Sequence, residues 1–350
     1  MRLRRTKVEF FGVLGSRQIA ACALALTVLV FLLPAATLPE QPLAQSGGES
    51  SSTQAKLPID RTVQTMASKD RGRAVRLLQD DGTVTQLTME EYLWGVVAAE
   101  MPASFEPEAL KAQACAARTY TVIRQQASTE KHPGADICAD STCCQAYIAK
   151  SDAEARWGLN AGEYTQKIQQ AVEETDGLGI LYQGQPIQAL FFSSAAGKTV
   201  DAVEVWGNHV DYLQSVDSPE GEEVPNYHSQ VVLSSEQVKQ AVLEAYPGAD
   251  LSGDPGQWFG EAVYSGEGLV SSIPVGGVTL TGSQVRTLFS LRSATFTVAW
   301  DGEAFTFDVT GYGHGVGMSQ YGANAMAKEG NDFTAILTWY YTGTEVAELW

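Results

Sequence analysis

Glu100 stands at the end of a predicted helix, where negative charge is disfavoured. In the segment EEYLWGVVAAEMP, residues 90–102, Leu93 and Val97 lie on the same side as Glu100, and Pro102 ends the helix at about Glu100. The helix carbonyls and the apolar neighbours would both raise the pKa of this carboxyl group. A glutamic acid that stays protonated near neutral pH can protonate a leaving oxygen. The alternative interpretation is an exposed acid at a helix end.

One histidine and three cysteines lie close together in HPGADICADSTCC. They are His132, Cys138, Cys143 and Cys144. This is the ligand set of a closed, tetrahedral structural zinc site, and a three-ligand catalytic site with a bound water is a further possibility. In an external compartment Cys138 could instead form a disulfide with Cys143 or Cys144, although one thiol would then be left over.

A glycine-rich segment, GYGHGVGMSQYGANAMA, covers residues 311–327. So many glycines indicate positive φ angles and a close approach of the backbone to another group. Ser319 can cap the helix that follows. The side chains that suit a saccharide are Tyr312, His314, Gln320 and Tyr321. A tight loop with a structural histidine would have the same composition. In FFSSAAGK, residues 191–198, a predicted strand runs into Ser193, Ser194 and a Gly-Lys turn, and this second loop offers the two serine hydroxyls.

The elements around these residues predict an α+β fold of helices and β-hairpins in a single large domain with a substrate cleft. Thr88 and Glu91 form a capping box at the start of the Glu100 helix, and Pro107 opens the next one. Hairpins are predicted around Asp80-Asp81-Gly82, Gly184-Gln185-Pro186 and Asp301-Gly302. Further helices are predicted over 160–175, 234–246, 281–291, 323–328 and 333–341.

The chain is acidic, with 23 bases, 41 acids and a formal net charge of −18 over 350 residues. Five of the bases lie in the first 38 residues with only one of the acids, Glu9, so the rest is more acidic still. Nucleic acid is therefore excluded as a partner, because phosphate neutralisation requires Lys and Arg.

The N-terminus predicts export and membrane attachment. Residues 1–18 form a basic tail, and residues 19–38 are an uncharged apolar run long enough to span a bilayer. The bases precede the run, which predicts a single-pass membrane protein with a cytoplasmic N-terminus and an extracytoplasmic bulk. A cleaved signal peptide is the alternative. Residues 39–58 are rich in Ser, Gly, Gln and Pro and predict a flexible tether, so the catalytic domain is expected over 59–350.

Four segments, in order, closely resemble the stage II sporulation protein D family, which also includes bacterial amidase enhancers. They are TMEEYLWGVVAAEMP, EALKAQACAARTY, the stretch from VEVWG to YLQSVDSP, and GYGHGVGMSQYGANAMA. The resemblance covers roughly residues 59–345. It implies a membrane-anchored lytic transglycosylase that acts on peptidoglycan during engulfment of the forespore, beside a partner amidase and other membrane engulfment proteins. Its substrate would be glycan strands stripped of stem peptides.

The resemblance also assigns residues. It makes Glu100 the catalytic acid and implies a structural zinc held by His132, Cys138, Cys143 and Cys144, ahead of Gln145, although Cys143 stands where the family pattern has histidine. The residues it places at the substrate are Arg118, Ser193, Ser194, His314, Gly315, Met318, Ser319, Gln320 and Tyr321, and Tyr312 joins them on its residue type. Arg118 is expected near the glycan and not beside Glu100, because a guanidinium next to Glu100 would lower the pKa that the acid role requires.

A lytic transglycosylase needs only one carboxyl group, because the C6 hydroxyl of N-acetylmuramic acid closes onto C1 and no water is added. Two other functions stay open. One is a non-catalytic, glycan-binding enhancer of an amidase. The other is a hydrolase that uses Glu100 with a second acid such as Glu106 or Asp217.

Overall fold

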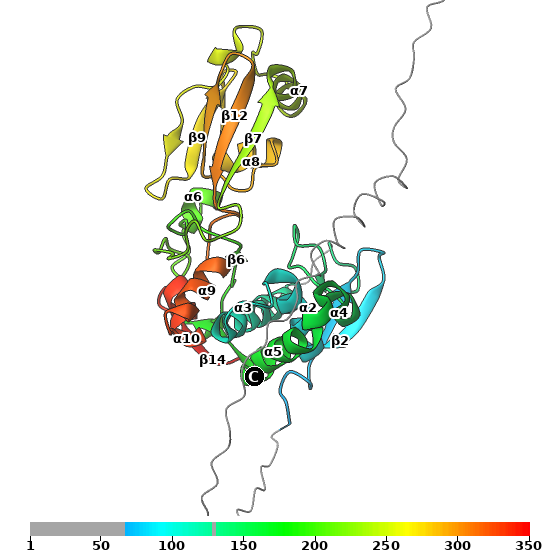
Figure 1. Ribbon diagram of the computed structural model, residues 1–350. Coiled ribbons are helices and arrows are strands. Elements are labelled where there is room, and N and C mark those ends of the chain that lie inside the picture. The colour runs from blue at the N-terminus through cyan, green and yellow to red at the C-terminus, as the bar shows by residue number, and fades with distance from the viewer. Residues whose placement is uncertain (1–66, 128–130) are drawn as a thin grey trace, which may run out of the picture. The chain divides into compact units, whose positions relative to one another are not determined.

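The computed structural model describes residues 67–127 and 131–350 (Figure 1). These residues form helices and five small sheets, so the α+β class is confirmed. The predicted basic tail, apolar segment and tether, residues 1–58, lie outside the described residues. Within the described part, no helix is both long and apolar enough to cross a membrane.

The described α-helices are mostly short, and α3 is the longest. They are α2 (Met89–Glu100), α3 (Pro107–Gln126), α4 (Lys150–Trp157), α5 (Ala161–Glu174), α6 (Ala202–Trp206), α7 (Ser235–Ala245), α8 (Gly282–Leu288), α9 (Gln320–Lys328) and α10 (Phe333–Tyr340). Two single 3-10 turns, η1 and η2, cover Gly158–Asn160 and Pro255–Gln257.

The five sheets have two or three strands each. Their strand orders are β2-β1-β3, β14-β4-β5, β13-β6, β10-β9-β8 and β11-β12-β7. The strands of the first three sheets are β1 (Ala74–Leu78), β2 (Val84–Thr88), β3 (Ile137–Cys138), β4 (Leu178–Tyr182), β5 (Gln185–Pro186), β6 (Phe191–Phe192), β13 (Met318–Ser319) and β14 (Glu345–Glu348). Those of the other two are β7 (His228–Ser234), β8 (Val263–Tyr264), β9 (Val270–Val275), β10 (Val278–Leu280), β11 (Phe296–Trp300) and β12 (Ala304–Thr310).

Helix α3 lies at the centre of one hydrophobic core, where it contacts α2, α5, α9 and α10. Figure 1 shows α2, α3 and α5 side by side. The middle of α3 is buried on all sides and is rich in alanine, including Ala112, Ala114, Ala116 and Ala117. These small side chains let neighbouring helices approach closely. Cys115, in the same run, is also fully buried and packs as a small apolar residue.

The predicted signals at the ends of α2 are confirmed. The side chain of Thr88 accepts the backbone N–H of Glu91, and the carboxylate of Glu91 accepts the N–H of Thr88 at 2.8 Å. At the other end, Met101 has extended backbone geometry before Pro102, so the helix ends at Glu100. This termination leaves Glu100 at the edge of the first core.

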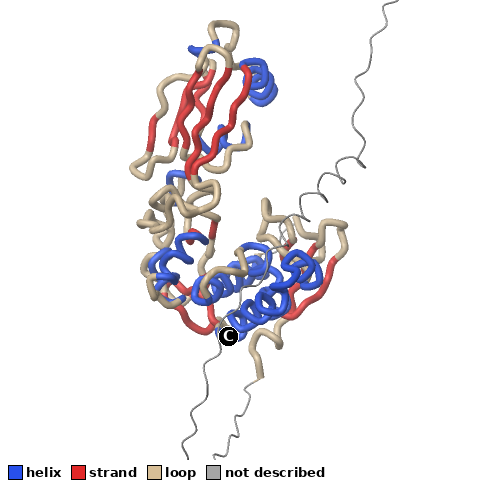
Figure 2. Tube along the Cα trace, in the orientation of Figure 1, coloured by secondary structure: helices blue, strands red, loops and turns tan. Residues whose placement is uncertain are grey.

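A second hydrophobic core forms between the sheets β11-β12-β7 and β10-β9-β8 and the helices α7 and α8. Strand β12 pairs with β11 and β7 in antiparallel register. Figure 2 shows long strands, drawn in red, running side by side in this part of the chain. Phe259, Phe289 and Phe307 contact one another with ring centroids 5.0–6.3 Å apart. The predicted hairpin around Asp301-Gly302 and the helices predicted over 234–246 and 281–291 are confirmed, and Ser234 and Thr281 are the N-caps of these helices.

The predicted hairpin around Gly184 is correct only at its turn. Strand β4 pairs with the two residues of β5, and the chain then leaves this sheet. Phe191 and Phe192 pair instead with Met318 and Ser319, in parallel. A hairpin needs only local chain geometry, whereas this parallel pair joins segments more than 120 residues apart.

Candidate active site

Glu100 is half-buried at the end of α2 and accepts two hydrogen bonds. The backbone N–H of Ala146 donates to its Oε1 at 2.6 Å. The side-chain amide of Gln320 donates to its Oε2 at 3.3 Å. Among the described residues, Glu100 forms no ion pair. Two neutral donors from distant segments therefore orient the carboxyl group.

Burial raises the pKa of Glu100 above its usual value of 4.5. The hydrogen bonds from Ala146 and Gln320 oppose this shift because they stabilise the carboxylate, but burial is the larger effect. The sequence predicted this direction from the apolar neighbours and the helix end, and the direction is confirmed. A carboxyl group in this state can donate a proton and afterwards accept one.

The loop that follows the cysteines holds Glu100 through close packing against α2. The backbone N–H of Ile148 donates to the carbonyl of Gly95 at 3.2 Å, and the rings of Tyr92 and Tyr147 are stacked with centroids 6.0 Å apart. A Cβ atom at Gly95 would overlap Tyr147. Glycine at this position of the helix therefore allows the loop to bring Ala146 to Glu100.

The glycine-rich loop packs backbone to backbone against the segment around Ser193 and Ser194. Ser194 and Tyr312 exchange backbone hydrogen bonds at 3.0 and 2.8 Å. Gly317 has a φ of 80°, and a Cβ there would overlap the carbonyl of Leu190. Two of the predicted loops are thus brought together, and the positive φ angle and close approach expected of the glycines are confirmed.

Helix α9 begins directly after this loop and carries Gln320 to Glu100. Ser319 caps the helix, as predicted, by accepting the backbone N–H of Gly322 at 3.2 Å. The hydroxyl of Ser319 also donates to the buried carboxylate of Glu220. The position of Gln320 therefore depends on the cap and on Glu220.

Glu220 is a buried acid, only 4% exposed, and sequence analysis did not single it out. It accepts the backbone N–H of Ala195 at 2.7 Å and the hydroxyl of Ser218 at 2.5 Å, besides that of Ser319. It forms no ion pair with any described residue. Glu220 thus ties the Ser194 segment to the start of α9. Its sequence context, SPEGEE, contains three acids and gives no sign of which one is buried.

The predicted substrate residues of the glycine-rich loop divide into exposed and buried ones. Tyr312 is 43% exposed, Gly315 and Tyr321 are half-buried, and the Tyr321 ring lies edge-on to Phe105 at 4.9 Å. Met318 and Ser319 are fully buried, so their side chains present no surface to a glycan. The prediction that these two side chains contact the substrate is therefore wrong, and their role is to support the loop.

His314 is half-buried and lies between Phe192 and Trp206, with ring centroids 5.5 and 5.8 Å away. Burial lowers its pKa to about 4, and the charge of Arg286 acts in the same direction. Its Nδ1 accepts the backbone N–H of Val316 at 3.1 Å. The imidazole is therefore neutral at physiological pH and shapes the loop.

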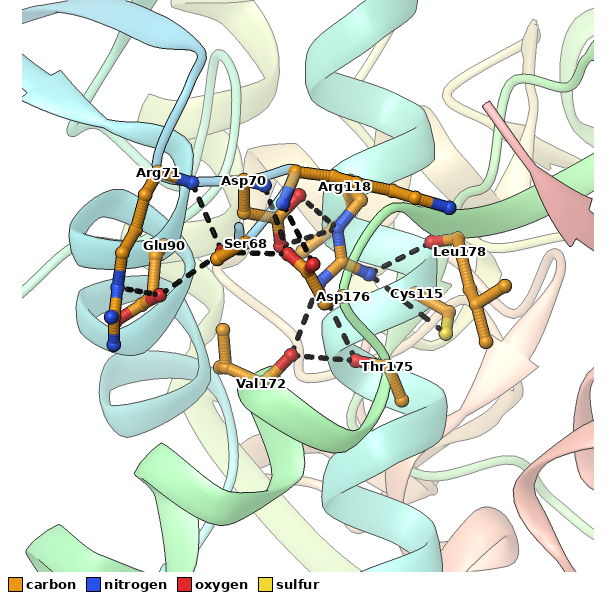
Figure 3. Close-up of polar contacts among 12 residues, drawn as sticks. Ser68, Asp70, Arg71, Glu90, Cys115, Arg118, Val172, Thr175, Asp176 and Leu178 are labelled. Carbon is orange, nitrogen blue, oxygen red and sulfur yellow. Dashed lines mark hydrogen bonds and ion pairs between the residues drawn. The ribbon is translucent and has the colours of Figure 1, made fainter. Parts of the chain in front are cut away.

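Arg118 is fully buried and does not lie at a substrate surface, so the expectation that it contacts a glycan is wrong. Figure 3 shows its guanidinium directed at Asp70, with Nη2 at 2.7 Å from Oδ2. Nη1 donates to the carbonyl of Leu178 at 2.8 Å. Asp70 is held in turn by Asp176, which accepts its backbone N–H at 2.9 Å. Sequence analysis could not identify this partner among so many acids.

The predicted cysteine and histidine cluster is assembled. The donor atoms of His132, Cys138, Cys143 and Cys144 all lie within 4.8 Å of one another. Nε2 of His132 is 3.4 Å from the sulfur of Cys143 and 3.6 Å from that of Cys144. A tetrahedral zinc site with bond lengths of about 2.0–2.3 Å implies nitrogen–sulfur separations of roughly 3.5 Å. The four residues could therefore hold a metal ion, and the cysteines are free thiols in this structure.

The cluster is close in sequence to the backbone that contacts Glu100. Cys144 precedes Ala146 by two residues, and the side chain of Gln145 donates to the hydroxyl of Tyr92 on α2 at 2.9 Å. Burial lowers the pKa of His132, and Arg124 and Lys131 act in the same direction, which favours the neutral imidazole that binds metals. Any ligand that holds the four cluster residues in place therefore also holds the loop that carries Ala146.

The fold and site define an α+β protein in which one half-buried carboxyl group lies between a cysteine-anchored loop and a glycine-rich loop. Comparison with known proteins then identifies the family. The profile of the family described as Stage II sporulation protein matches residues 79–182, which include Glu100 and the four cluster residues.

Three relatives are similar over most of the chain. Stage II sporulation protein D of Bacillus subtilis (strain 168) is 34% identical over 95% of this chain and 96% of its own length. Stage II sporulation protein D of Bacillus amyloliquefaciens is 38% identical over 76% of each chain. The amidase enhancer of Bacillus subtilis (strain 168) is 29% identical over 72% of this chain and 40% of its own length. The chain therefore belongs to the stage II sporulation protein D family.

Proposed function

We propose that this protein is a peptidoglycan lytic transglycosylase that acts in sporulation. The observation that carries the proposal is the state of Glu100, a single carboxyl group whose pKa burial raises and which two neutral donors orient. Membership of the stage II sporulation protein D family and the relatives of that name support the sporulation role.

In the proposed reaction Glu100 acts first as an acid and then as a base. It gives its proton to the glycosidic oxygen while the bond from that oxygen to C1 of N-acetylmuramic acid breaks. The resulting carboxylate accepts the proton of the C6 hydroxyl while O6 bonds to C1. The products are a shortened strand and a 1,6-anhydro end, and no water is consumed. Ala146 and Gln320 donate to the carboxylate between the two proton transfers, which lowers the energy of that state.

We assign a structural zinc ion to His132, Cys138, Cys143 and Cys144, in line with the donor separations described above. The ion would crosslink the loop that carries Ala146 and would take no part in the bond-breaking steps. We further propose a membrane anchor over 19–38 and an extracytoplasmic catalytic domain with a substrate cleft. The family resemblance implies stem-stripped glycan strands as substrate, and a cell-wall amidase and engulfment proteins as partners; the amidase enhancer among the relatives supports the amidase link.

The test is mass spectrometry of the products from glycan strands with and without stem peptides. The full chain is compared with the Glu100→Gln variant, and circular dichroism verifies that both are folded. We expect products lighter by one water than hydrolysis products from the unchanged protein, and none from the variant. Activity of the variant within a few-fold of the unchanged protein would refute the assignment of Glu100. Ordinary reducing ends would identify a hydrolase with a second carboxylate.

An amidase enhancer without catalytic activity is the second candidate, and its support is the amidase enhancer among the relatives. In that case the protein alone would release no glycan fragments, and stem-peptide release by a cell-wall amidase would increase when the protein is added. Because an enhancer would act by binding, Glu100→Gln should then stimulate the amidase as well as the unchanged protein does.

A further inference from the structure

Two arginines beside the glycine-rich loop have no acidic partner, although acids outnumber bases 41 to 23 in this chain. Most ion pairs among the described residues join a lysine or arginine to a carboxylate, as in Arg76–Asp136 and Lys198–Asp217. Arg286 and Arg292 form no ion pair within the described residues. Among the described residues, an unpaired base such as Arg156 is exposed, whereas Arg286 and Arg292 are half-buried, and it is this burial without a counter-charge that needs an explanation.

Arg292 lies against the first residues of the loop, and Arg286 is close enough for its charge to interact with Tyr312 and His314. The guanidinium carbon of Arg292 is 3.9 Å from the centroid of the Tyr312 ring, and the carbonyl of Arg292 accepts the N–H of Gly313 at 3.0 Å. Arg286 is in α8, and its Nε donates to the carbonyl of Leu291 at 3.4 Å. Both residues are half-buried.

The surroundings remove water from the arginines without supplying an opposite charge. The Nε of Arg292 is buried and has no hydrogen-bond partner in the described residues. Burial lowers the pKa of Arg286, and the group that opposes this shift is Tyr312, not a carboxylate. Partly buried cations without counter-charges are costly. Stacking on Tyr312 accounts for the position of Arg292 but not for Arg286.

The site is continuous with the segments that lead to Glu100. Tyr312 pairs with Ser194 through the backbone, and the same loop continues to Gln320, which donates to Glu100. The hydroxyl of Ser194 is buried and has no partner within the described residues. Tyr312 itself is 43% exposed and offers a flat aromatic surface of the kind on which sugar rings pack.

We propose that Arg286, Arg292 and Tyr312 form a subsite for a carboxylate group of the glycan strand. A guanidinium binds a carboxylate through two parallel hydrogen bonds, and the partly dry surroundings strengthen this contact. On a strand stripped of stem peptides the carboxylate belongs to the lactyl group of each N-acetylmuramic acid, whereas on an intact strand it belongs to the stem peptide. The inference rests on the proposed function, since it assigns this surface to the same substrate.

The test measures binding of four strands by the full chain carrying Glu100→Gln, so that no strand is consumed. The strands are stem-stripped glycan, the same glycan with its lactyl carboxylates converted to methylamides, glycan with intact stem peptides, and an oligomer of N-acetylglucosamine. Arg286→Gln and Arg292→Gln are introduced singly and together. Arg156→Gln, which removes an exposed charge on α4, is the matched control, and Arg292→Lys keeps the charge but loses the paired hydrogen bonds.

We expect each Gln variant to weaken binding of the stem-stripped glycan about tenfold, because a charge-assisted contact is lost. Binding of the methylamide strand and of the N-acetylglucosamine oligomer should not change, and Arg156→Gln should have no effect on any strand. Arg292→Lys should fold like the unchanged protein and retain only part of the affinity. If the arginine variants weaken binding only of strands with intact stem peptides, the bound carboxylate is that of the stem peptide, and this result also supports the subsite.

Equal weakening on charged and neutral strands would overturn the subsite, because the arginines would then act through packing. Unchanged binding in the double variant would also overturn it. If no strand binds to the protein with its arginines intact, both the subsite and the proposed function fail. If binding depends on the arginines but the protein with Glu100 cleaves nothing, the proposed function alone fails.

Discussion

The side-chain amide of Gln320 donates to the carboxylate of Glu100 at 3.3 Å, although the two residues are 220 positions apart. The same amide nitrogen lies 3.5 Å from the Oε1 of Gln113 on α3. Gln320 is the first residue of α9, where the glycine-rich loop ends. This hydrogen bond directly links the helix that ends at Glu100 to the glycine-rich segment, residues 311–327.

Replacing Gln320 with leucine should move the pH profile of the reaction. The hydrogen bond from Gln320 lowers the pKa of Glu100, so its loss raises that pKa further. Activity that requires protonated Glu100 is lost as the pH rises through this pKa, and the alkaline limb of kcat/KM should therefore shift to higher pH. The maximum should fall about tenfold, since a hydrogen bond to the carboxylate state is lost.

The matched variant for Gln320 is Gln113→Leu, which removes the neighbour of the amide but not the donor to Glu100. Its alkaline limb should stay in place. A limb in Gln320→Leu that moves to lower pH would contradict the assigned direction.

Glu100→Gln should change the pH dependence of stability. The folded-state pKa of Glu100 is above its usual 4.5, so the folded state binds more protons than the unfolded state as the pH passes this window. The contribution of Glu100 to stability is therefore fully present below about pH 4.5 and is lost as the pH rises through the raised pKa. Urea unfolding from pH 4 to 8 should show the variant gaining stability relative to the unchanged protein as the pH increases. A difference that is constant or decreases with pH would refute the raised pKa.

Glu220→Ala should destabilise the protein by about 3 kcal/mol, because the N–H of Ala195 and the hydroxyls of Ser218 and Ser319 lose a buried acceptor. It should also lower kcat at temperatures where the protein is folded, since the cap before Gln320 is disturbed. Glu220→Gln should restore part of both losses.

The control for Glu220 is Glu222→Ala, which changes an exposed acid two residues further along the chain. This variant should stay within about 0.5 kcal/mol of the unchanged protein. Glu220→Ala with unchanged kcat would mean that Glu220 stabilises the fold but does not position Gln320.

Arg118→Ala should destabilise the protein by about 3–5 kcal/mol because it leaves Asp70 buried without its cation. The folded fraction should keep its KM for glycan strands, since Arg118 is fully buried. Chemical unfolding and steady-state kinetics at low temperature measure the two effects separately.

Arg71→Ala provides the comparison for Arg118, because Arg71 pairs with Glu90 but its side chain is 61% exposed. This substitution should cost no more than about 1 kcal/mol. If fully folded Arg118→Ala had a higher KM for glycan strands, the sequence-based prediction that Arg118 contacts the glycan would be supported after all.

Removing a metal ion should affect both stability and catalysis. A chelator should lower Tm by about 10 °C, since a structural zinc site contributes several kcal/mol to folding. It should lower kcat as well, because the loop of Cys144 also carries the Ala146 N–H that contacts Glu100. Cys143→Ser should reproduce both losses and remove the response to chelator.

Cys115→Ala, which changes a buried cysteine outside the cluster, should leave the chelator response intact. A protein that is destabilised by a thiol reductant but not by a chelator would indicate a disulfide in place of the metal site.

Local signals in the sequence determined much of the site. The capping box at Thr88 and Pro102 set the ends of α2, so the place of Glu100 at the helix terminus and the direction of its pKa shift were predictable. The glycine-rich loop and the Ser319 cap were predictable for the same reason, since caps and turns depend on residues a few positions apart. The cluster of His132 and the three cysteines also lies within a short stretch of chain.

Only the tertiary structure decided the contacts between distant segments. It paired Arg118 with Asp70, buried Glu220 beneath the start of α9, and joined Phe191 to Met318 in a parallel pair. These outcomes depend on which of many chemically similar residues are buried together, and burial arises from the packing of the whole core. The sequence by itself therefore identified the acid and its helix, while the fold selected the residues that hold the acid in place.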